Sequence, residues 1–482
     1  MMGLRQKYRT LPESVKAAVA FIISSVFTQG LHIITTPIYT RLLSTADMGI
    51  VSAYGSYDSI LGTIVGMGFV SGAFSIAMNE YSEKRDQYSS SILFLSMIVS
   101  TIAFVIMLFF RGTLSGIMHL NTSLIMLMGL GFVLTPARSM WNAKNRFEFK
   151  YRITILVSIA SLLVSVGVSL LAIVWYKQNT DVNLGQVRLV ASSIVSYSVS
   201  LVIAIYIYLK GKCFINVSYW RFALTAGIPM VIHSIAKVIF DSSDRIMILH
   251  LCGASDVGIY GTLYSISSVA AIFWTAINGS LVPYLFDCIN KDRTTSIQKV
   301  TNVLLGVYAA GCGLFILVAP EIVALLTTNE YMGGIHMIPS VAAGIYFTAL
   351  YNMYSTMLLY RKKTKKIMIA TVISAIVNIV LNYLLIPKYG YIAASYTTLA
   401  SYIVLAITQY IFMKQEMKSD YYDEKVFIGL SSGMIFFSVF ANAIYKYLVI
   451  RYICILVLVI VGTVNRKKIY VTVLKVRKKE TD

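Results

Sequence analysis

Residues 152–175 read RITILVSIASLLVSVGVSLLAIVW, and the only charged side chain in this stretch is the arginine at its start. A transmembrane helix needs about 20 mainly apolar residues to cross the hydrocarbon core of a bilayer. Similar stretches recur along the whole chain, separated by short polar or charged segments. The sequence therefore predicts an all-α, polytopic membrane protein.

The chain contains about fourteen such stretches. They cover residues 15–38, 48–76, 89–110, 122–141, 152–175, 187–209, 221–244, 256–285, 298–319, 334–359, 367–386, 390–413, 426–445 and 448–464. The first stretch has no cleavage site of the A-x-A type, so we expect it to be retained as a helix.

The overall composition agrees with a membrane protein. Of 482 residues, 57% are hydrophobic and 13% are charged, and the mean hydropathy is +0.73, which is too apolar for a soluble fold with a polar surface. The net charge of +20 does not predict a nucleic-acid partner, because the basic residues lie between apolar stretches rather than on one soluble face. The five cysteines are widely spaced and form no C-x-x-C pair, so neither a disulfide framework nor a metal site is predicted.

The basic residues predict the orientation. With the N-terminus inside, 32 of the 41 lysine and arginine residues fall in inside segments and 8 in outside loops, while Lys237 lies within a span. Cytoplasmic loops retain lysine and arginine, so both termini are predicted to be cytoplasmic in the cell membrane. The basic tail, residues 465–482, is expected to lie on the cytoplasmic membrane surface.

Two inside segments are especially basic, and two interpretations of them stay open. They anchor the topology beside anionic lipid headgroups, or they gather an anionic, lipid-linked substrate at a cytoplasmic entrance. The candidate entrance residues are Lys144, Arg146, Lys150, Arg361, Lys362 and Lys363.

A short internal repeat suggests how the spans are grouped. Asp47-Met-Gly49-Ile follows the first span, and Asp256-Val-Gly258-Ile follows the seventh. Many transporter folds arose by duplication. We therefore predict an N-terminal six-helix bundle over residues 1–213 and a C-terminal six-helix bundle over 214–414, followed by two additional helices over 415–464.

The same segments carry a resemblance to a known family. The stretch from Thr36 to Gly49 (TPIYTRLLSTADMG), together with Gly227-Ile-Pro229, Asp244-Arg245-Ile and Val257-Gly258-Ile-Tyr260, resembles the polysaccharide repeat-unit (Wzx-type) flippases of the multidrug/oligosaccharidyl-lipid/polysaccharide (MOP) exporter superfamily. With the span count, the resemblance covers the whole chain.

The resemblance implies two six-helix bundles around a cavity that opens alternately to either side of the membrane. It implies a cargo of undecaprenyl-diphosphate-linked oligosaccharide, delivered to the outer leaflet for capsule, O-antigen or exopolysaccharide assembly. The expected partners are this substrate, anionic membrane lipids, and a polysaccharide polymerase with other assembly proteins.

Ionisable groups inside a bilayer cost about 2.5–3.5 kcal/mol each on insertion scales, so they usually face a cavity or a partner. In the seventh span they recur every four residues and share one helix face, as His233, Lys237, Asp241 and Arg245. Lys237 and Arg245 can hold a diphosphate while Asp241 pairs with either of them in its absence. Alternatively, the same residues are closed ion pairs that neutralise a helix end.

Other polar residues are candidate cavity groups with simpler alternatives. His32 and Arg41 lie in or near the first span, Asp58 lies in the second, and Asn278 lies in the eighth. Asn278, like Asn378 and Asn382 in the eleventh span, can hydrogen-bond sugar hydroxyls or hold helices together. Gly62, Gly66 and Gly68 in the second span are expected to permit close helix packing, with bending as the alternative.

No catalytic role is predicted. The sequence has neither a G-x-x-x-x-G-K-[ST] phosphate loop nor an H-E-x-x-H motif, so we expect a transporter without a cofactor rather than an enzyme. Two alternatives stay open: a multidrug or toxin cation antiporter of the same superfamily, and a membrane polysaccharide polymerase. The antiporter would need a cavity centred on carboxylates, and the polymerase a long external loop.

Overall fold

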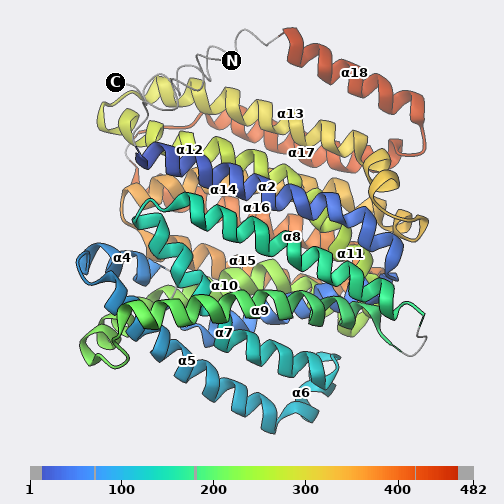
Figure 1. Ribbon diagram of the computed structural model, residues 1–482. Helices are drawn as coiled ribbons and strands as arrows, with labels where there is room; N and C mark the ends of the chain where they lie inside the picture. The colour runs from blue at the N-terminus through green and yellow to red at the C-terminus, as the bar shows by residue number, and fades with distance from the viewer. Residues whose placement is uncertain (1–12, 70–71, 179–181, 418, 465–482) are drawn as a thin grey trace, which may run out of the picture. The chain divides into compact units, whose positions relative to one another are not determined.

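The computed structural model describes residues 13–69, 72–178, 182–417 and 419–464. Within these ranges the regular structure consists of α-helices and one 3-10 helix, with no β-strand (Figure 1). The predicted all-α fold is confirmed. The predicted tail, 465–482, lies outside the described residues.

The chain divides into two compact units, Met1–His250 and Leu251–Asp482. The division differs from the boundary predicted after residue 213, because the seventh predicted span lies with the N-terminal unit up to His250. The predicted grouping into two six-helix bundles and two added helices stays a prediction.

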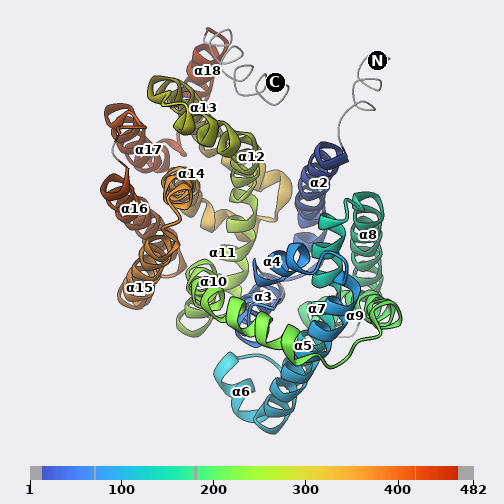
Figure 2. The ribbon, with the colours of Figure 1, turned by 90° about the vertical axis from the view of Figure 1, so that its left-hand side faces the viewer.

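The N-terminal unit is built from nine described helices. They are α2 (Glu13–Leu42), α3 (Thr45–Val65), α4 (Gly72–Glu80), α5 (Arg85–Phe109), α6 (Arg111–Met118), α7 (Thr122–Phe147), α8 (Tyr151–Tyr176), α9 (Leu184–Gly211) and α10 (Val217–Leu251). Helix α7 packs against α5 and α9, and α8 packs against α9 and α2 (Figure 2). Helices α2, α7, α8 and α9 are therefore neighbours within the N-terminal unit.

The C-terminal unit contains eight α-helices and the 3-10 helix in its described part. They are α11 (Ala254–Ser267), α12 (Val269–Asn290), α13 (Thr294–Leu326), η1 (Asn329–Met337), α14 (Ile338–Tyr360), α15 (Thr364–Tyr389), α16 (Tyr391–Glu416), α17 (Glu424–Ile444) and α18 (Leu448–Val464). Helix α16 packs against both α14 and α15 (Figure 2). On α18, the nearly buried Arg451 forms an ion pair with Glu321 of α13.

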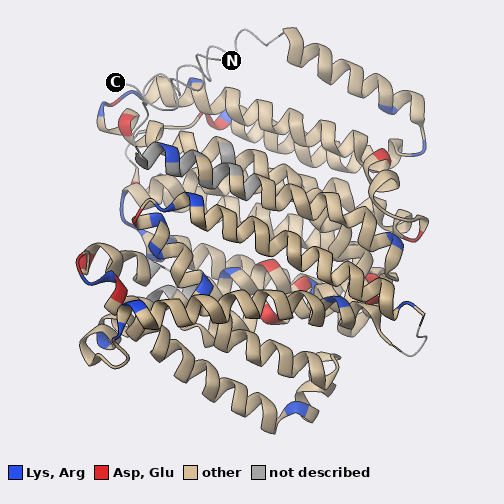
Figure 3. Cartoon of the chain, viewed as in Figure 1, with Lys and Arg blue, Asp and Glu red and all other residues tan. Residues whose placement is uncertain are grey.

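Ten helical segments in the described ranges are long and apolar enough to cross a membrane. They are α5, α7, α8, α9, α11 with α12, α13, η1 with α14, α15, α16 and α17. Helix α18 is a shorter apolar helix. The other three predicted spans coincide with α2, with α3 and α4, and with α10, and their crossing of the bilayer stays a prediction. Charged residues lie mostly at helix ends and in turns (Figure 3).

The second predicted span is broken. Helix α3 ends at Val65 with Gly66 as its C-cap, and Met67 and Gly68 then adopt positive φ angles of 42° and 69°. Two consecutive residues in this region cannot continue a right-handed helix. Close packing does occur one turn earlier, where a Cβ at Gly62 would lie 3.3 Å from Phe132 Cε1.

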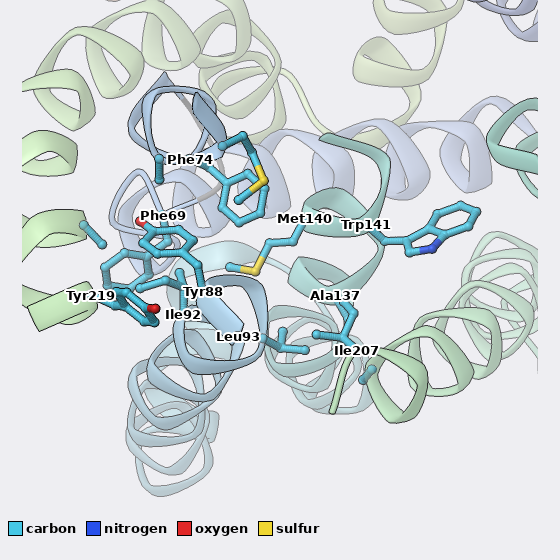
Figure 4. Packing of buried hydrophobic residues seen from close by; sticks show 14 of the residues in the cluster. Phe69, Phe74, Tyr88, Ile92, Leu93, Ala137, Met140, Trp141, Ile207 and Tyr219 are labelled. Carbon is cyan, nitrogen blue, oxygen red and sulfur yellow. The ribbon is translucent and has the colours of Figure 1, made fainter. Parts of the chain in front are cut away.

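A buried core joins α4, α5, α7, α9 and α10. Phe74, Tyr88, Met140 and Tyr219 are all nearly inaccessible to solvent and belong to this cluster (Figure 4). The rings of Tyr88 and Tyr219 lie 5.3 Å apart between centroids. Because burial of aromatic rings contributes strongly to stability, this cluster fixes the first turns of α10 to the rest of the N-terminal unit.

The repeated Asp-x-Gly-Ile motif starts a helix in both units. Asp47 is the third residue of α3, where it forms a capping box with Ser44, and Asp256 is the third residue of α11. Asp47 Oδ1 also accepts a hydrogen bond of 3.0 Å from the backbone N–H of Gly185 at the start of α9. A carboxylate in the first turn satisfies backbone N–H groups and favours the helix dipole, so the motif has a structural role.

Candidate functional site

The predicted charged stripe on α10 forms contacts along its own helix. Lys237 Nζ lies 2.7 Å from Asp241 Oδ2, and the two side chains are 51% and 39% exposed. Arg245 Nη1 donates to the backbone carbonyl of Asp241 at 2.9 Å. The side chain of His233 lies outside the described residues. We call Lys237, Asp241 and Arg245 the α10 stripe, and its role in binding stays a prediction.

Both ends of α10 contact other helices of the N-terminal unit. Tyr219 packs in the aromatic core near the first turn. At the other end, Tyr57 Oη of α3 and His250 Nε2 lie within hydrogen-bond distance, at 3.0 Å. The His250 ring also lies 4.5 Å from the His119 ring between centroids. The α10 stripe therefore lies between two fixed ends.

The other predicted cavity residues are spread over three helices. On α2, Arg41 Nη1 donates to the backbone carbonyl of Pro37 at 3.0 Å, and His32 is exposed. Asp58 on α3 and Asn278 on α12 are half-buried. Their assignment to a transport cavity stays a prediction.

The first basic segment separates into groups with different environments. Lys144 is 6% exposed and forms ion pairs with Asp86 of α5 and with Glu148, the latter at 3.4 Å. Lys150 Nζ lies 2.5 Å from Glu148 Oε2. Burial raises the pKa of Glu148, but the hydrogen bond from Lys150 and the charge of Lys144 outweigh this effect and hold the pKa below its usual value. Lys144 and Glu148 thus stabilise the turn between α7 and α8.

The second basic segment, at the end of α14, is exposed. Lys363 pairs with Glu416 of α16 at 3.2 Å, and Arg361 Nε donates to Met417 Sδ at 3.4 Å. Lys362 is exposed and has a positive φ of 57°. An entrance function for this segment stays a prediction.

The asparagines of α15 are buried and hydrogen-bonded to protein. Asn378 and Asn382 are both 0% exposed, and Asn382 Nδ2 donates to Asn378 Oδ1 at 3.1 Å. Asn382 Oδ1 also accepts a hydrogen bond from the hydroxyl of Thr397 on α16. These contacts favour helix–helix packing over sugar binding for both residues.

A polar cavity of about 420 Å³ lies within the N-terminal unit. It is lined by residues of α2 (Ser24, Thr28, Gln29), α7 (Arg138, Asn142, Arg146), α8 (Thr154, Ile155, Ser158, Ser161, Leu162, Ser165) and α9 (Ser196). Of these thirteen lining residues, eleven are polar, two are arginines and none is acidic. We call this site the polar cavity.

The helical spacing of the lining residues explains the cavity. On α7, Arg138, Asn142 and Arg146 recur every four residues, so they share one face. On α8, Thr154, Ser158, Ser161 and Ser165 form a second polar row at intervals of three or four residues. Arg138 Nη2 donates to Ser161 Oγ at 2.7 Å, which orients the guanidinium across the space between the two helices.

The sequence analysis included Arg146 among its candidates but missed Arg138 and the α8 row. Arg138 lies within four residues of the predicted end of the fourth span, where a basic residue is typical of a cytoplasmic membrane boundary. The serines of α8 are compatible with an ordinary apolar span. The matching periodicities of 138, 142, 146 and of 154, 158, 161, 165 were the available signal.

Comparison with known proteins establishes the family. A family model described as "Polysaccharide biosynthesis protein" matches residues 14–289, which include every residue lining the polar cavity. The chain belongs to this polysaccharide biosynthesis family. A second family model, described as MatE, matches residues 229–384.

Two curated relatives show low identity. The capsular polysaccharide biosynthesis protein CapF of Staphylococcus aureus is 23% identical over 246 residues, which are 50% of this chain and 62% of CapF. The match thus spans less than two thirds of CapF. The probable low-salt glycan biosynthesis flippase Agl15 of Haloferax volcanii is 21% identical over 394 residues, 81% of each protein.

Two solved structures have the same fold as this chain. The lipid II flippase MurJ in an inward closed conformation superimposes with a TM-score of 0.68 at 15% identity, covering 94% of this chain and all of MurJ. An inward-facing MATE multidrug transporter of the MOP superfamily gives a TM-score of 0.59 at 14% identity, covering 80% of this chain and 94% of that one. The resemblance seen in the sequence is confirmed at the level of family and fold.

Proposed function

We propose that this protein is a flippase that moves undecaprenyl-diphosphate-linked oligosaccharide repeat units from the inner to the outer leaflet of the cytoplasmic membrane by alternating access. The observation that carries the proposal is the family match over residues 14–289, in a polytopic fold like that of MurJ. Both termini are cytoplasmic in this proposal, as the distribution of basic residues indicates.

The charge of the polar cavity supports an anionic cargo. Arg138 and Arg146 line it, and no acidic residue is among its described lining residues. Arginine binds phosphate in a bidentate, charge-assisted manner. An organic cation would be repelled by the same lining, which favours the flippase over a multidrug antiporter.

The membrane potential assists the proposed direction of transport. No ATP-binding phosphate loop is present in the sequence, so a different energy source is required. Each negative charge that moves outward across 100 mV of inside-negative potential gains about 2.3 kcal/mol. Consumption of the cargo by a polymerase on the outer side further favours net export.

Deletion of the gene in its native cell tests the proposal, provided that no second flippase is present. We expect complete lipid-linked repeat units to accumulate in the inner leaflet, and surface polysaccharide to be lost, with both effects reversed by the wild-type gene. The measurement is the amount of lipid-linked oligosaccharide accessible to a membrane-impermeant glycosidase before and after lysis.

Other outcomes separate the alternatives. Single repeat units that reach the outer face but stay unpolymerised would contradict flipping and indicate a polymerase. Normal surface polysaccharide with increased sensitivity to cationic drugs would indicate an antiporter.

A further inference from the structure

The polar cavity presents two kinds of hydrogen-bonding group that suit different parts of one ligand. We propose that it binds a glycosyl phosphate, in which an anionic phosphoryl group is joined to a sugar bearing hydroxyls. This inference deepens the proposed function and rests on it for the source of the ligand, the headgroup of a lipid-linked oligosaccharide.

The α7 side of the polar cavity supplies donors for the phosphoryl group. Arg138 and Arg146 are eight residues apart on α7, which corresponds to about 12 Å along the helix axis. The hydrogen bond from Arg138 to Ser161 fixes the inner guanidinium. Arginines at this separation fit an extended anion better than a single small ion.

The α8 side supplies acceptors. The hydroxyls of Thr154, Ser161 and Ser165 donate to the backbone carbonyls of Lys150, Ser158 and Ser192 at 3.0, 3.1 and 3.3 Å. Because the hydrogen of each hydroxyl is used in this way, its oxygen offers lone pairs to the cavity. Such oxygens bind the O–H groups of a sugar but repel a bare phosphate.

Asn142 provides an independent sign that a ligand donates a hydrogen bond here. Its Oδ1 atom is buried and has no hydrogen-bond partner in the described structure, although the residue lines the polar cavity between the two arginines. An unsatisfied buried acceptor costs about 1–3 kcal/mol. Rotation of the Asn142 side chain toward the polar cavity would let a sugar hydroxyl beside the phosphoryl group satisfy this atom.

The lining also disfavours other ligand classes. A metal or coupling cation would need carboxylates, and the described lining has none. A nucleotide base would need an aromatic or apolar surface, and the apolar residues among the described lining are Ile155 and Leu162. The volume of about 420 Å³ lies within the range of about 300–1,000 Å³ found for small-molecule sites.

The position of the polar cavity suits loading of the cargo. Arg146 lies one residue before the end of α7, and Thr154 lies in the first turn of α8. The site therefore extends inward from the α7–α8 turn, which lies on the cytoplasmic side in the proposed orientation. A headgroup that enters from the inner leaflet would meet Arg146 first and Arg138 last.

Calorimetric titration of the full chain in phosphatidylcholine nanodiscs tests the inference. The soluble probes are glucose 1-phosphate, inorganic phosphate and methyl glucoside. We expect glucose 1-phosphate to bind at least about ten-fold more tightly than either of the other two, because only this probe engages both sides of the polar cavity. Undecaprenyl-diphosphate-linked oligosaccharide added to the nanodiscs should compete with it, whereas lack of competition would assign the site to soluble sugar phosphates and overturn the headgroup assignment.

Variants separate the two sides of the polar cavity. Arg138→Ala should weaken glucose 1-phosphate binding by at least about ten-fold, and Arg138→Lys, which keeps the charge but loses the fork, should weaken it less. Asn142→Ala should weaken glucose 1-phosphate binding while leaving phosphate binding unchanged. Arg111→Ala, which removes an exposed arginine of α6 in the same unit, is the matched control and should bind like the wild type.

Clear results would overturn the inference. These are wild-type affinity in well-folded Arg138→Ala and Arg138→Lys, equal binding of methyl glucoside, or tighter binding of phosphate than of glucose 1-phosphate. If Arg138→Ala binds normally but gene deletion still traps repeat units inside, the inference fails and the proposed function stands. If binding is lost in Arg138→Ala but deletion traps nothing, the proposed function fails and the ligand site stands.

Discussion

The polar residues of α7 and α8 differ from those of α15 and α16 in whether the protein satisfies them. Asn378 and Asn382 of α15 are fully buried and bonded to each other and to threonines of α16. Asn142 of α7 is also buried at its Oδ1 atom, yet it lines a cavity and that atom has no partner among the described groups.

The difference gives a physical criterion for intramembrane polar residues. A polar group that is paired within protein holds helices together, because breaking the pair leaves both partners unsatisfied. A polar group beside empty volume is available to a ligand. We therefore expect mutations in α7 to affect transport and mutations in α15 to affect stability.

The largest expected effect comes from Arg138→Ala. Loss of its charge-assisted hydrogen bonds to the cargo, typically worth about 1.5–3 kcal/mol each, should lower surface polysaccharide by at least about ten-fold in cells. Immunoblotting of membranes should show an unchanged protein level. A normal polysaccharide level would contradict a role of Arg138 in transport. A loss of protein would indicate that Arg138 stabilises helix packing, as Asn382 of α15 does.

Asn382→Leu is expected to lower the stability of the protein and to leave transport unchanged. This change removes the hydrogen bond from Asn382 to Asn378 Oδ1 and the acceptor that Asn382 offers to the Thr397 hydroxyl, and it should lower the stability by about 1–3 kcal/mol. Thermal unfolding of the purified protein measures the loss, while transport per molecule should stay normal.

Removal of both partners provides the control for Asn382. In the double variant Asn382→Leu/Thr397→Val, the hydroxyl that bonds to Asn382 in the wild type is removed together with its partner, so part of the lost stability should return. If the single variant is stable but transports poorly, Asn382 belongs to a binding site and the criterion fails.

The α10 stripe is intermediate between the polar residues of α7 and those of α15, because its charged groups contact one another but are partly exposed. Lys237→Ala and Arg245→Ala should each reduce surface polysaccharide by several-fold at an unchanged protein level, because a lysine and an arginine can exchange their contacts on α10 for an anionic cargo. Lys291 is a matched control, since it forms a similar exposed i,i+4 pair with Asp287 at 2.5 Å. Equal results for Lys237→Ala and Lys291→Ala would assign the α10 stripe to surface ion pairs.

The smallest effect is expected at the α7–α8 turn. The lowered pKa of Glu148 means that its ion pairs contribute stability above the pKa of the unfolded chain, about 4.3, and that this contribution is lost as the pH falls through the lower folded value. Glu148→Gln should therefore lower the melting temperature slightly at pH 7 and have less effect near pH 3. Glu83→Gln, at an exposed site, should have no effect at either pH.

The sequence predicted the helices well because apolar length is a local property. Each predicted span corresponds to one described helix or to two consecutive ones. The break at Met67 and Gly68 was missed because the glycines there fit close packing as well as a helix end. Lys144 was grouped with Arg146 although its partner Asp86 lies 58 residues away, a contact that only the packing of α5 against α7 reveals.

The polar cavity was beyond the sequence analysis for a similar reason. Its lining comes from four helices, and no single helix carries both the arginines and the serine row. Arg138, near the end of a span, looks like an ordinary topology residue until α8 is placed beside it. The comparison with α15 also needs three dimensions, because Asn142 and Asn382 look alike in a hydropathy profile.

The short turn between α7 and α8 constrains how a bound headgroup is released. Only residues 148–150 separate the two helices. The hydrogen-bond donors on α7 and the acceptors on α8 that line the polar cavity are therefore expected to move together. Helix α2 is held to α8 at its far end, where Tyr39 Oη and Ser169 Oγ are 2.6 Å apart, and Thr28 lines the polar cavity about three turns earlier. We therefore expect α2 to rotate relative to the α7–α8 hairpin about the Tyr39–Ser169 contact. Restraining α2 in the closed position would keep the headgroup in the polar cavity.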